Sequence, residues 1–298
     1  MQLISHLIKM IVYIASYPRS GNSLTQNIIQ TFFERPITTD DKGSRDKGSQ
    51  KAKVYASGKI PFVTNWRWPN DHPQQPSKWD KLQARILQNN LSRWIALYDL
   101  NVPPYTKDCR YLLPDCSRVL TPKNRQQLAT EDGYFVIKTH RLPFKQYFSG
   151  EYVIQPIRHP GAVLWSFLNL KKANGDRTSL EQVISESSWS DYHQIWNQAI
   201  ALLNGKLIRI RFENALLEPL DVCDKISATI GLGYNPENQM PSFKELNQKN
   251  SKHFRAGKVQ DWSEHYTYDQ IQLLQNLHGE TMKQLDYQIP KTLTLAYN

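Results

Sequence analysis

The sequence has 298 residues, which is enough for one large α/β domain with a sizeable core and does not require two domains. Its net charge of +10 suggests a nucleic-acid-binding protein, but the Lys and Arg residues are dispersed, so we expect a basic site for a small anion and no nucleic-acid partner. The three cysteines have no metal-binding spacing and leave an odd count, which favours reduced thiols in a cytoplasmic protein. The apolar run within residues 1–10 is too short for a signal peptide or a membrane anchor, so no membrane association is expected.

Segments rich in Val and Ile alternate along the chain with segments of helical spacing. The expected strands are residues 11–16, 134–138, 152–157 and 207–212, and the expected helices are residues 23–33, 78–97, 161–172, 191–203, 214–230 and 268–285. This alternation predicts a single α/β domain over residues 1–298, with three layers in which a central parallel sheet has helices on both faces. Binding residues are then expected at the carboxyl ends of the strands.

The first expected strand leads into a tight turn and a helix through the sequence Tyr-Pro-Arg-Ser-Gly-Asn-Ser-Leu at residues 17–24. Backbone N–H groups at a helix start are unpaired, the helix dipole adds partial positive charge and Arg19 adds a full one. The turn therefore predicts a cradle for a phosphate or a sulfate. An ATP-binding P-loop needs Lys followed by Ser or Thr at the loop end, and Asn22 and Ser23 stand there instead. An ordinary strand-to-helix turn with a serine cap is the alternative for this motif alone.

Three later segments supply further groups that suit an anionic nucleotide. Lys138 and His140 emerge together at the end of one buried strand, which places a cation and a base at a carboxyl strand end. Arg158 follows the next strand and Ser166 lies two turns into the helix after it, so the pair is suited to hold a second phosphate. Residues 254–262 form a basic, Gly-containing loop that would cap a bound nucleotide.

In this order the motifs resemble those of the sulfotransferases that use 3′-phosphoadenosine-5′-phosphosulfate (PAPS), over residues 11 to 267. Residues 17–24 resemble the 5′-phosphosulfate loop Tyr-Pro-Lys-Ser-Gly-Thr-Thr-Trp, and Lys138-Thr139-His140 resembles the strand that carries the catalytic His. The spacing of eight between Arg158 and Ser166 is that of the 3′-phosphate motif. Two further matches are Phe212-Glu213-Asn214 with Tyr-Glu-Asp, and Arg255 to Trp262 with Arg-Lys-Gly-x-x-Gly-Asp-Trp.

The resemblance implies a P-loop-like α/β fold and a role for each matched residue. His140 would be the general base, while Lys138 and Arg19 would hold the transferring sulfonate and the leaving 5′-phosphate. PAPS would be the sulfuryl donor, and the scheme requires no metal. The residues implied in donor binding are Arg19, Ser20, Gly21, Asn22, Ser23, Leu24, Arg158, Ser166, Phe212, Arg255, Ala256 and Gly257.

Several positions depart from the family pattern. Arg19 replaces a Lys and cannot donate its proton to a leaving group, which shifts that burden to Lys138. Leu24 stands where the family has the Trp that stacks on adenine, so stacking must come from elsewhere or be lost. Ala256 and Gln260 replace a Lys and a Gly of the closing loop. We therefore expect weaker nucleotide binding than is usual for the family.

Two segments are expected to contact a small-molecule acceptor with a hydroxyl or amine group. Residues 38–79 change from a polar stretch to one rich in Pro and Trp, and residues 100–121 carry Tyr and Asp side chains that suit a cationic acceptor. A natural product such as an alkaloid of the saxitoxin type fits this description. A solvated surface excursion is the alternative for residues 40–59. The sequence does not decide between a monomer and a homodimer.

Other histidines and other functions have their own expectations. His159 is expected to cap or pack, His253 and His265 to lie on the surface, Glu213 to orient nearby backbone or basic groups, and Trp165 to be part of the core. A P-loop kinase or NTPase is disfavoured, because the Lys-Ser/Thr pair is missing and no strand-end Asp is suited to Mg²⁺. A non-catalytic nucleotide-binding protein of the same fold is the other alternative.

Overall fold

The computed structural model describes residues 9–33, 37–39, 122, 125–126, 133–242, 244–245 and 261–290. Several expectations lie outside these residues. They concern the helix at 78–97, nearly all of the two acceptor segments, His253, and the loop residues Arg255, Ala256 and Gly257.

The described strands form one parallel sheet of five strands in the order β2-β3-β1-β4-β5. Their bounds are Lys9–Ala15 for β1, Ile37–Thr39 for β2, Gly133–Thr139 for β3, Glu151–Ile157 for β4 and Leu207–Arg211 for β5. Four of them match the predicted strands, and the parallel sheet is confirmed. The three-residue strand β2 was not predicted, because Ile-Thr-Thr is too short to show an alternating pattern.

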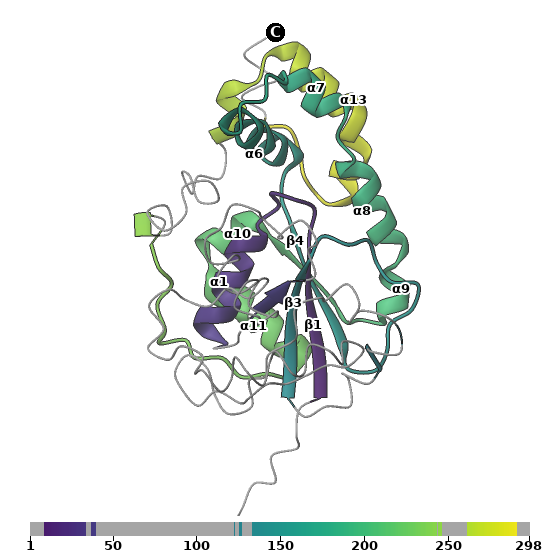
Figure 1. The fold of residues 1–298 in the computed structure, drawn as a ribbon, viewed down its shortest axis with the longest axis vertical. Coiled ribbons are helices and arrows are strands. Elements are labelled where there is room, and N and C mark those ends of the chain that lie inside the picture. Colours follow the sequence, from purple (N-terminus) through teal and green to yellow (C-terminus); the bar gives the residue numbers. More distant parts are fainter. Residues whose placement is uncertain are drawn as a thin grey trace, which may run out of the picture.

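Helices cover both faces of this sheet, which confirms the three-layer architecture (Figure 1). Their bounds are Asn22–Phe32 for α1, Pro160–Ala173 for α6, Leu180–Ser185 for α7, Trp189–Gln198 for α8, Ile200–Leu203 for α9, Phe212–Leu217 for α10, Pro219–Ile230 for α11 and Tyr268–Gln284 for α13, with a 3₁₀ helix η4 at Asp261–His265. The expected helix 191–203 is divided at Ala199 into α8 and α9. The expected helix 214–230 is divided before Pro219, because proline cannot continue the hydrogen bonding of a helix interior.

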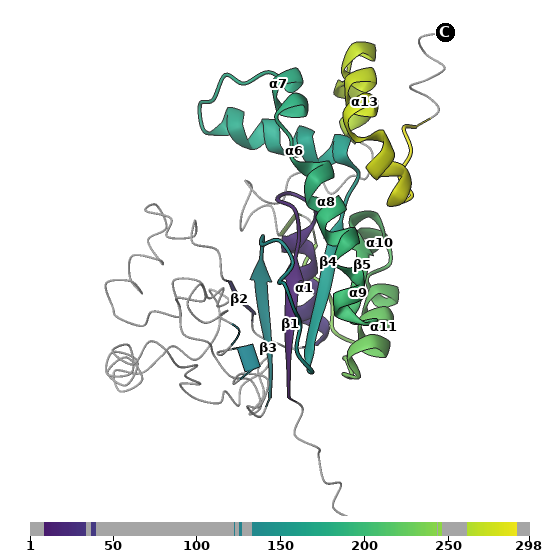
Figure 2. The same ribbon diagram turned by 90° about the vertical axis from the view of Figure 1, so that its right-hand side faces the viewer.

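The central strand β1 is buried on both faces, which explains its continuous apolar sequence. Alternate residues point to opposite sides of the sheet. Val12 and Ile14 pack with α1, α10 and α11, while Ile11 and Tyr13 pack with Tyr192 and Trp196 of α8. Helices α6, α7 and α13 lie beyond the carboxyl ends of the strands (Figure 2). The expected site is therefore bordered by α1 on one side and by α6 above.

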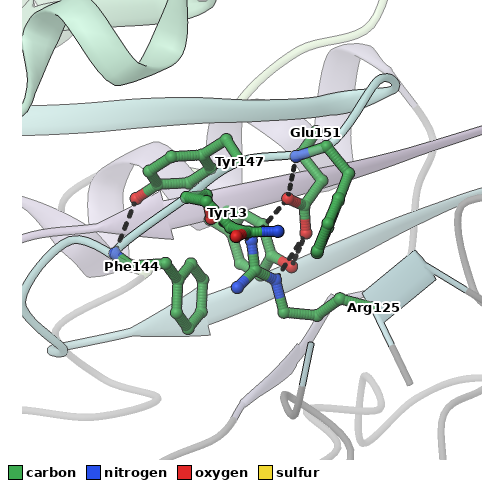
Figure 3. Close-up of polar contacts among 7 residues, drawn as sticks. Tyr13, Arg125, Phe144, Tyr147 and Glu151 are labelled. Carbon is green, nitrogen blue, oxygen red and sulfur yellow. Dashed lines mark hydrogen bonds and ion pairs between the residues drawn. The ribbon is translucent and has the colours of Figure 1, made fainter. Parts of the chain in front are cut away.

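A buried polar cluster joins Tyr13 of β1 and Glu151, at the amino end of β4, to Arg125 (Figure 3). The Glu151 carboxylate, fully buried, accepts hydrogen bonds from Arg125 Nε at 2.7 Å, Arg125 Nη2 at 2.6 Å and the Tyr13 hydroxyl at 2.7 Å. The Phe148 N–H donates to the same carboxylate at 2.8 Å, and the Arg125 guanidinium lies 3.7 Å from the centre of the Phe144 ring. Burial, followed by the charge of Glu151 and the hydrogen bond to it, raises the pKa of Tyr13. The cluster fixes the connection between β3 and β4, which begins at His140.

Candidate functional site

The turn after β1 has the backbone geometry of an anion cradle. Arg19 has φ 70° and Gly21 has φ 105°, so two residues in the left-handed region flank Ser20. The Ser20 N–H donates to the Tyr17 carbonyl at 3.2 Å, and α1 begins directly after Gly21. A side chain at Gly21 would be excluded, since its Cβ would lie 2.9 Å from Cδ2 of Phe212. The turn is therefore tight, and the N–H groups at the start of α1 face the space where an anion would bind.

A short polar network fastens this turn to β1. Asn22 Nδ2 donates to the Ser16 hydroxyl at 2.8 Å, and Asn22 Oδ1 accepts from Gln26 Nε2 at 2.6 Å. The Asn22 side chain thus has a structural role. The predicted contact of Asn22 with the donor would then be made by its backbone N–H. The Ser20 hydroxyl is buried and has no hydrogen-bond partner among the described residues. Such a group is destabilising unless a ligand oxygen satisfies it.

Strand β3 places His140 beside the turn. Its Nδ1 lies 2.7 Å from the backbone carbonyl oxygen of Ser16. Because a carbonyl oxygen only accepts, Nδ1 carries the hydrogen, and in the neutral ring the lone pair is on Nε2. Lys138 is two residues earlier, pairs with Ile14 of β1 and is 7% exposed. The role of Ser16 could not be predicted, because its carbonyl and hydroxyl act only through the tertiary arrangement.

Arg19 and Ser166, predicted to bind different parts of the donor, are in contact. Arg19 Nε donates to the Ser166 hydroxyl at 2.9 Å, which joins the turn to α6. The Arg158 guanidinium lies 4.0 Å from the centre of the Phe212 ring, and the same ring borders Gly21. The Phe212 ring therefore lies between the turn predicted to bind the 5′-phosphosulfate and Arg158, which is predicted to bind the 3′-phosphate.

The remaining predicted donor contacts are less closely joined to this group. Leu24 is 3% exposed and packs in the core formed by α1, α10 and α11. Ser23 is partly exposed at the start of α1, where its carbonyl accepts from Asn27 Nδ2 at 3.0 Å. Arg255, Ala256 and Gly257 are outside the described residues.

The expectation that His159 caps or packs is confirmed. Its Nδ1 accepts from the Gly161 N–H at 3.1 Å at the start of α6, and its Nε2 donates to the Gln288 carbonyl at 3.2 Å. Burial lowers its pKa to about 4, and the positive charge of Arg158 acts in the same direction. His265 is exposed, as expected, and its ring stacks on that of Trp165 with centroids 4.3 Å apart.

Three smaller findings complete the description. Glu213, expected to orient backbone or basic groups, accepts a hydrogen bond from the Tyr287 hydroxyl at 3.0 Å. Within the described residues, no group of three or more His, Cys, Asp or Glu side chains is placed to hold a metal ion. No helix in the same part of the chain has the length and apolar character needed to cross a membrane.

Comparison with known proteins identifies the family. The model of the sulfotransferase domain matches residues 10–286. A mouse sulfotransferase, SULT7A1, crystallised with 3′-phosphoadenosine-5′-phosphate (PAP), has a TM-score of 0.53 and 15% identity, over 94% of this chain and 90% of that one. Retinol dehydratase, crystallised with androsterone and the inactive cofactor PAP, has a TM-score of 0.49 and 14% identity, over 94% of this chain and 83% of that one.

The sulfotransferase domain of the olefin synthase from Synechococcus PCC 7002 has a TM-score of 0.48 and 14% identity, over 97% of this chain and 99% of that one. A search of curated proteins found no significant match. The likeness to the mouse enzyme shows a shared fold. Because the family model spans nearly the whole chain, this protein belongs to the sulfotransferase domain family.

Proposed function

We propose that this sulfotransferase moves a sulfuryl group from PAPS to a hydroxyl or amine of a small-molecule acceptor, with His140 as the general base. The observation that carries the proposal is the contact of His140 Nδ1 with the Ser16 carbonyl at 2.7 Å, beside the anion cradle. In this tautomer the neutral ring carries its basic lone pair on Nε2, the atom to which we assign the acceptor proton.

The residues around the turn fit a phosphosulfate donor. The buried Ser20 hydroxyl needs an acceptor, the helix start supplies N–H donors, and Arg19 adds a positive charge. Arg158 and Ser166 are suited to the 3′-phosphate that distinguishes PAPS from ordinary adenine nucleotides. When bound, PAPS supplies the sulfuryl group, and its product, 3′-phosphoadenosine-5′-phosphate (PAP), is the nucleotide found with the mouse sulfotransferase.

The catalytic step uses the proton on the acceptor and the charge on the donor. His140 Nε2 takes the acceptor proton as its oxygen or nitrogen attacks, and general base catalysis contributes about 10² to 10⁴ in rate. Lys138, 7% exposed, and Arg19 stabilise the negative charge that develops on the departing 5′-phosphate. Arg19 acts through charge alone because a guanidinium does not give up its proton, so Lys138 is the proton donor in this scheme. The scheme needs no metal.

The acceptor that we propose is a small natural product, for example an alkaloid of the saxitoxin type. The support for this class is in the sequence, where Asp108 and Asp115 lie in the segment expected beside the acceptor and suit a cationic molecule. We further propose a single domain over residues 1–298, acting in the cytoplasm.

Calorimetric titration of PAP, with adenosine monophosphate (AMP) and ATP–Mg²⁺ as controls, tests the donor. We expect PAP to bind most tightly, and Arg158→Ala to weaken PAP binding while AMP binding changes little. Preference for ATP–Mg²⁺, or no nucleotide binding, would contradict the proposal. Release of PAP from PAPS in the presence of a panel of phenols and amines then tests turnover. Binding without turnover across the panel would favour the non-catalytic alternative.

A further inference from the structure

His159 connects three parts of the chain that are distant in sequence. Its Nδ1 accepts from the Gly161 N–H at 3.1 Å, and its Nε2 donates to the Gln288 carbonyl at 3.2 Å. An imidazole makes both bonds only when it is neutral, with the hydrogen on Nε2. The ring therefore fastens the start of α6 to the segment that follows α13.

The faces of the same ring make two aromatic contacts. One face stacks on the indole of Trp262 in η4, with centroids 4.4 Å apart and planes inclined by 18°. The ring of Tyr287 meets it edge-on, with centroids 5.5 Å apart. Contacts of this kind add stabilisation beyond that of the buried area. Thus η4 and the segment that follows α13 both pack against the His159 ring.

The first turn of α6 is shaped to receive Trp262. A Cβ at Gly161 would lie 2.5 Å from the indole ring, so only glycine leaves room for this approach. The Tyr266 hydroxyl donates to the Gly161 carbonyl at 2.9 Å and holds η4 on the same turn. Figure 1 shows α6 beside the yellow segment that contains η4 and the beginning of α13.

This junction lies directly beside the groups assigned to the 3′-phosphate. Arg158 precedes His159 in the chain, and Ser166 lies in the helix that His159 caps. Ser166 also accepts from Arg19 of the turn at 2.9 Å. A displacement of the first turn of α6 therefore changes the position of Arg158 and Ser166 relative to the turn that holds the 5′ end of the donor.

We propose that His159 is a positioning residue of the donor site, which fixes Arg158 and α6 against η4 and the segment that follows α13. His159 touches neither donor nor acceptor in this role. The inference rests on the proposed PAPS site and extends it to a residue that the catalytic scheme does not use. It predicts that His159 governs selectivity for the 3′-phosphate rather than general nucleotide binding.

The test compares the dissociation constants of PAP and AMP, which differ by the 3′-phosphate, in the full-length protein. In His159→Asn the shorter side chain still accepts from the Gly161 N–H as a helix cap, but it lacks the ring and the bond to Gln288. We expect PAP binding to weaken about tenfold and AMP binding to change by less than about twofold. Gly161→Ala keeps His159 and displaces Trp262, and we expect the same selective loss.

His278→Asn is the matched control, because His278 is also buried, bonds through Nδ1 to the Ser190 hydroxyl at 2.8 Å and meets Trp189 edge-on. It lies between α13 and α8, so its replacement is expected to lower stability without changing the ratio of the two constants. An unchanged ratio in His159→Asn, or an equal loss for both nucleotides, overturns the inference. Failure of the wild-type protein to prefer PAP over AMP overturns the donor site itself, which is a separate result.

Discussion

Replacement of Arg125 by Met tests how strongly the buried cluster of Arg125, Glu151 and Tyr13 stabilises the fold. The methionine keeps most of the apolar stem against Phe144 but removes both charged hydrogen bonds to Glu151. The Glu151 carboxylate, fully buried, would keep only the donors from Tyr13 and Phe148. Removing one partner of a buried ion pair costs about 3–5 kcal/mol, because the other charge is left uncompensated. We expect a loss of that size in the free energy of unfolding.

Glu151→Gln is the complementary change, because it leaves the Arg125 guanidinium buried beside a neutral amide. The double variant contains neither charge, and the glutamine oxygen can still accept from Tyr13 or Phe148. We expect the double variant to lose at least about 2 kcal/mol less than the sum of the two single losses. Lys171→Met is the control, since the Lys171–Asp176 pair at 3.7 Å is open to solvent, and its loss is expected to change stability little.

Urea denaturation of the wild-type protein and the four variants at pH 7 gives these differences from the midpoints and slopes. Single variants within about 1 kcal/mol of wild type would refute the argument. So would losses that simply add in the double variant, because the cost would then come from packing rather than from charge pairing.

Three further predictions concern the site and its histidines. His140→Gln should lower turnover about 100-fold or more, because it removes the general base. The dissociation constant of PAP should stay within about twofold of the wild-type value, because no donor contact is lost. Equal losses in turnover and in PAP binding would contradict this role. Arg19→Gly should be about 1 kcal/mol more stable than Arg19→Ala in urea, since only glycine adopts φ 70° without strain, while both variants should bind PAP weakly. Burial lowers the pKa of His159 to about 4 and that of His193 to about 3, and the positive charges of Arg158 and Arg209 act in the same direction. The unfolded chain then binds more protons below pH ~6.5, so stability should fall as the pH drops from ~6.5 toward 4, by up to about 1.4 kcal/mol per pH unit for each histidine. His193→Phe should reduce that slope in pH-dependent unfolding measurements, and an unchanged slope would exclude His193 as a contributor.

The sheet could be predicted because its signals are local. Each of the four predicted strands is an apolar run bounded by polar or turn residues, and the structure places their ends within two residues of the expected positions. The division of the expected helix 214–230 before Pro219 was missed, although proline marks a helix start rather than a helix interior. The capped helix α7 was missed although Ser179 and Gln182 form a capping box, a signal that was readable.

The internal contacts of the site could not be predicted in the same way. The carbonyl of Ser16 fixes the tautomer of His140, 124 residues away, and no residue pattern shows which carbonyl a histidine will meet. The contact between Arg19 and Ser166 joins two motifs that the sequence assigned to opposite ends of a nucleotide. The stack of His159 on Trp262 depends on the small size of Gly161, which in sequence resembles any glycine near a helix start.

The turn at residues 17–21 breaks two rules of stability at the place where a donor is proposed to bind. Arg19 adopts a left-handed conformation that costs about 1–2 kcal/mol for a residue with a side chain, and the buried hydroxyl of Ser20 has no partner within the described structure. Glycine and alanine at these two positions would remove both penalties. They would also remove the charge and the donor that an anion needs. An anion in the turn would offset both costs, because its oxygens accept from Ser20 and pair with Arg19. Local instability in the free protein and affinity for an anionic donor are thus two consequences of the same residues.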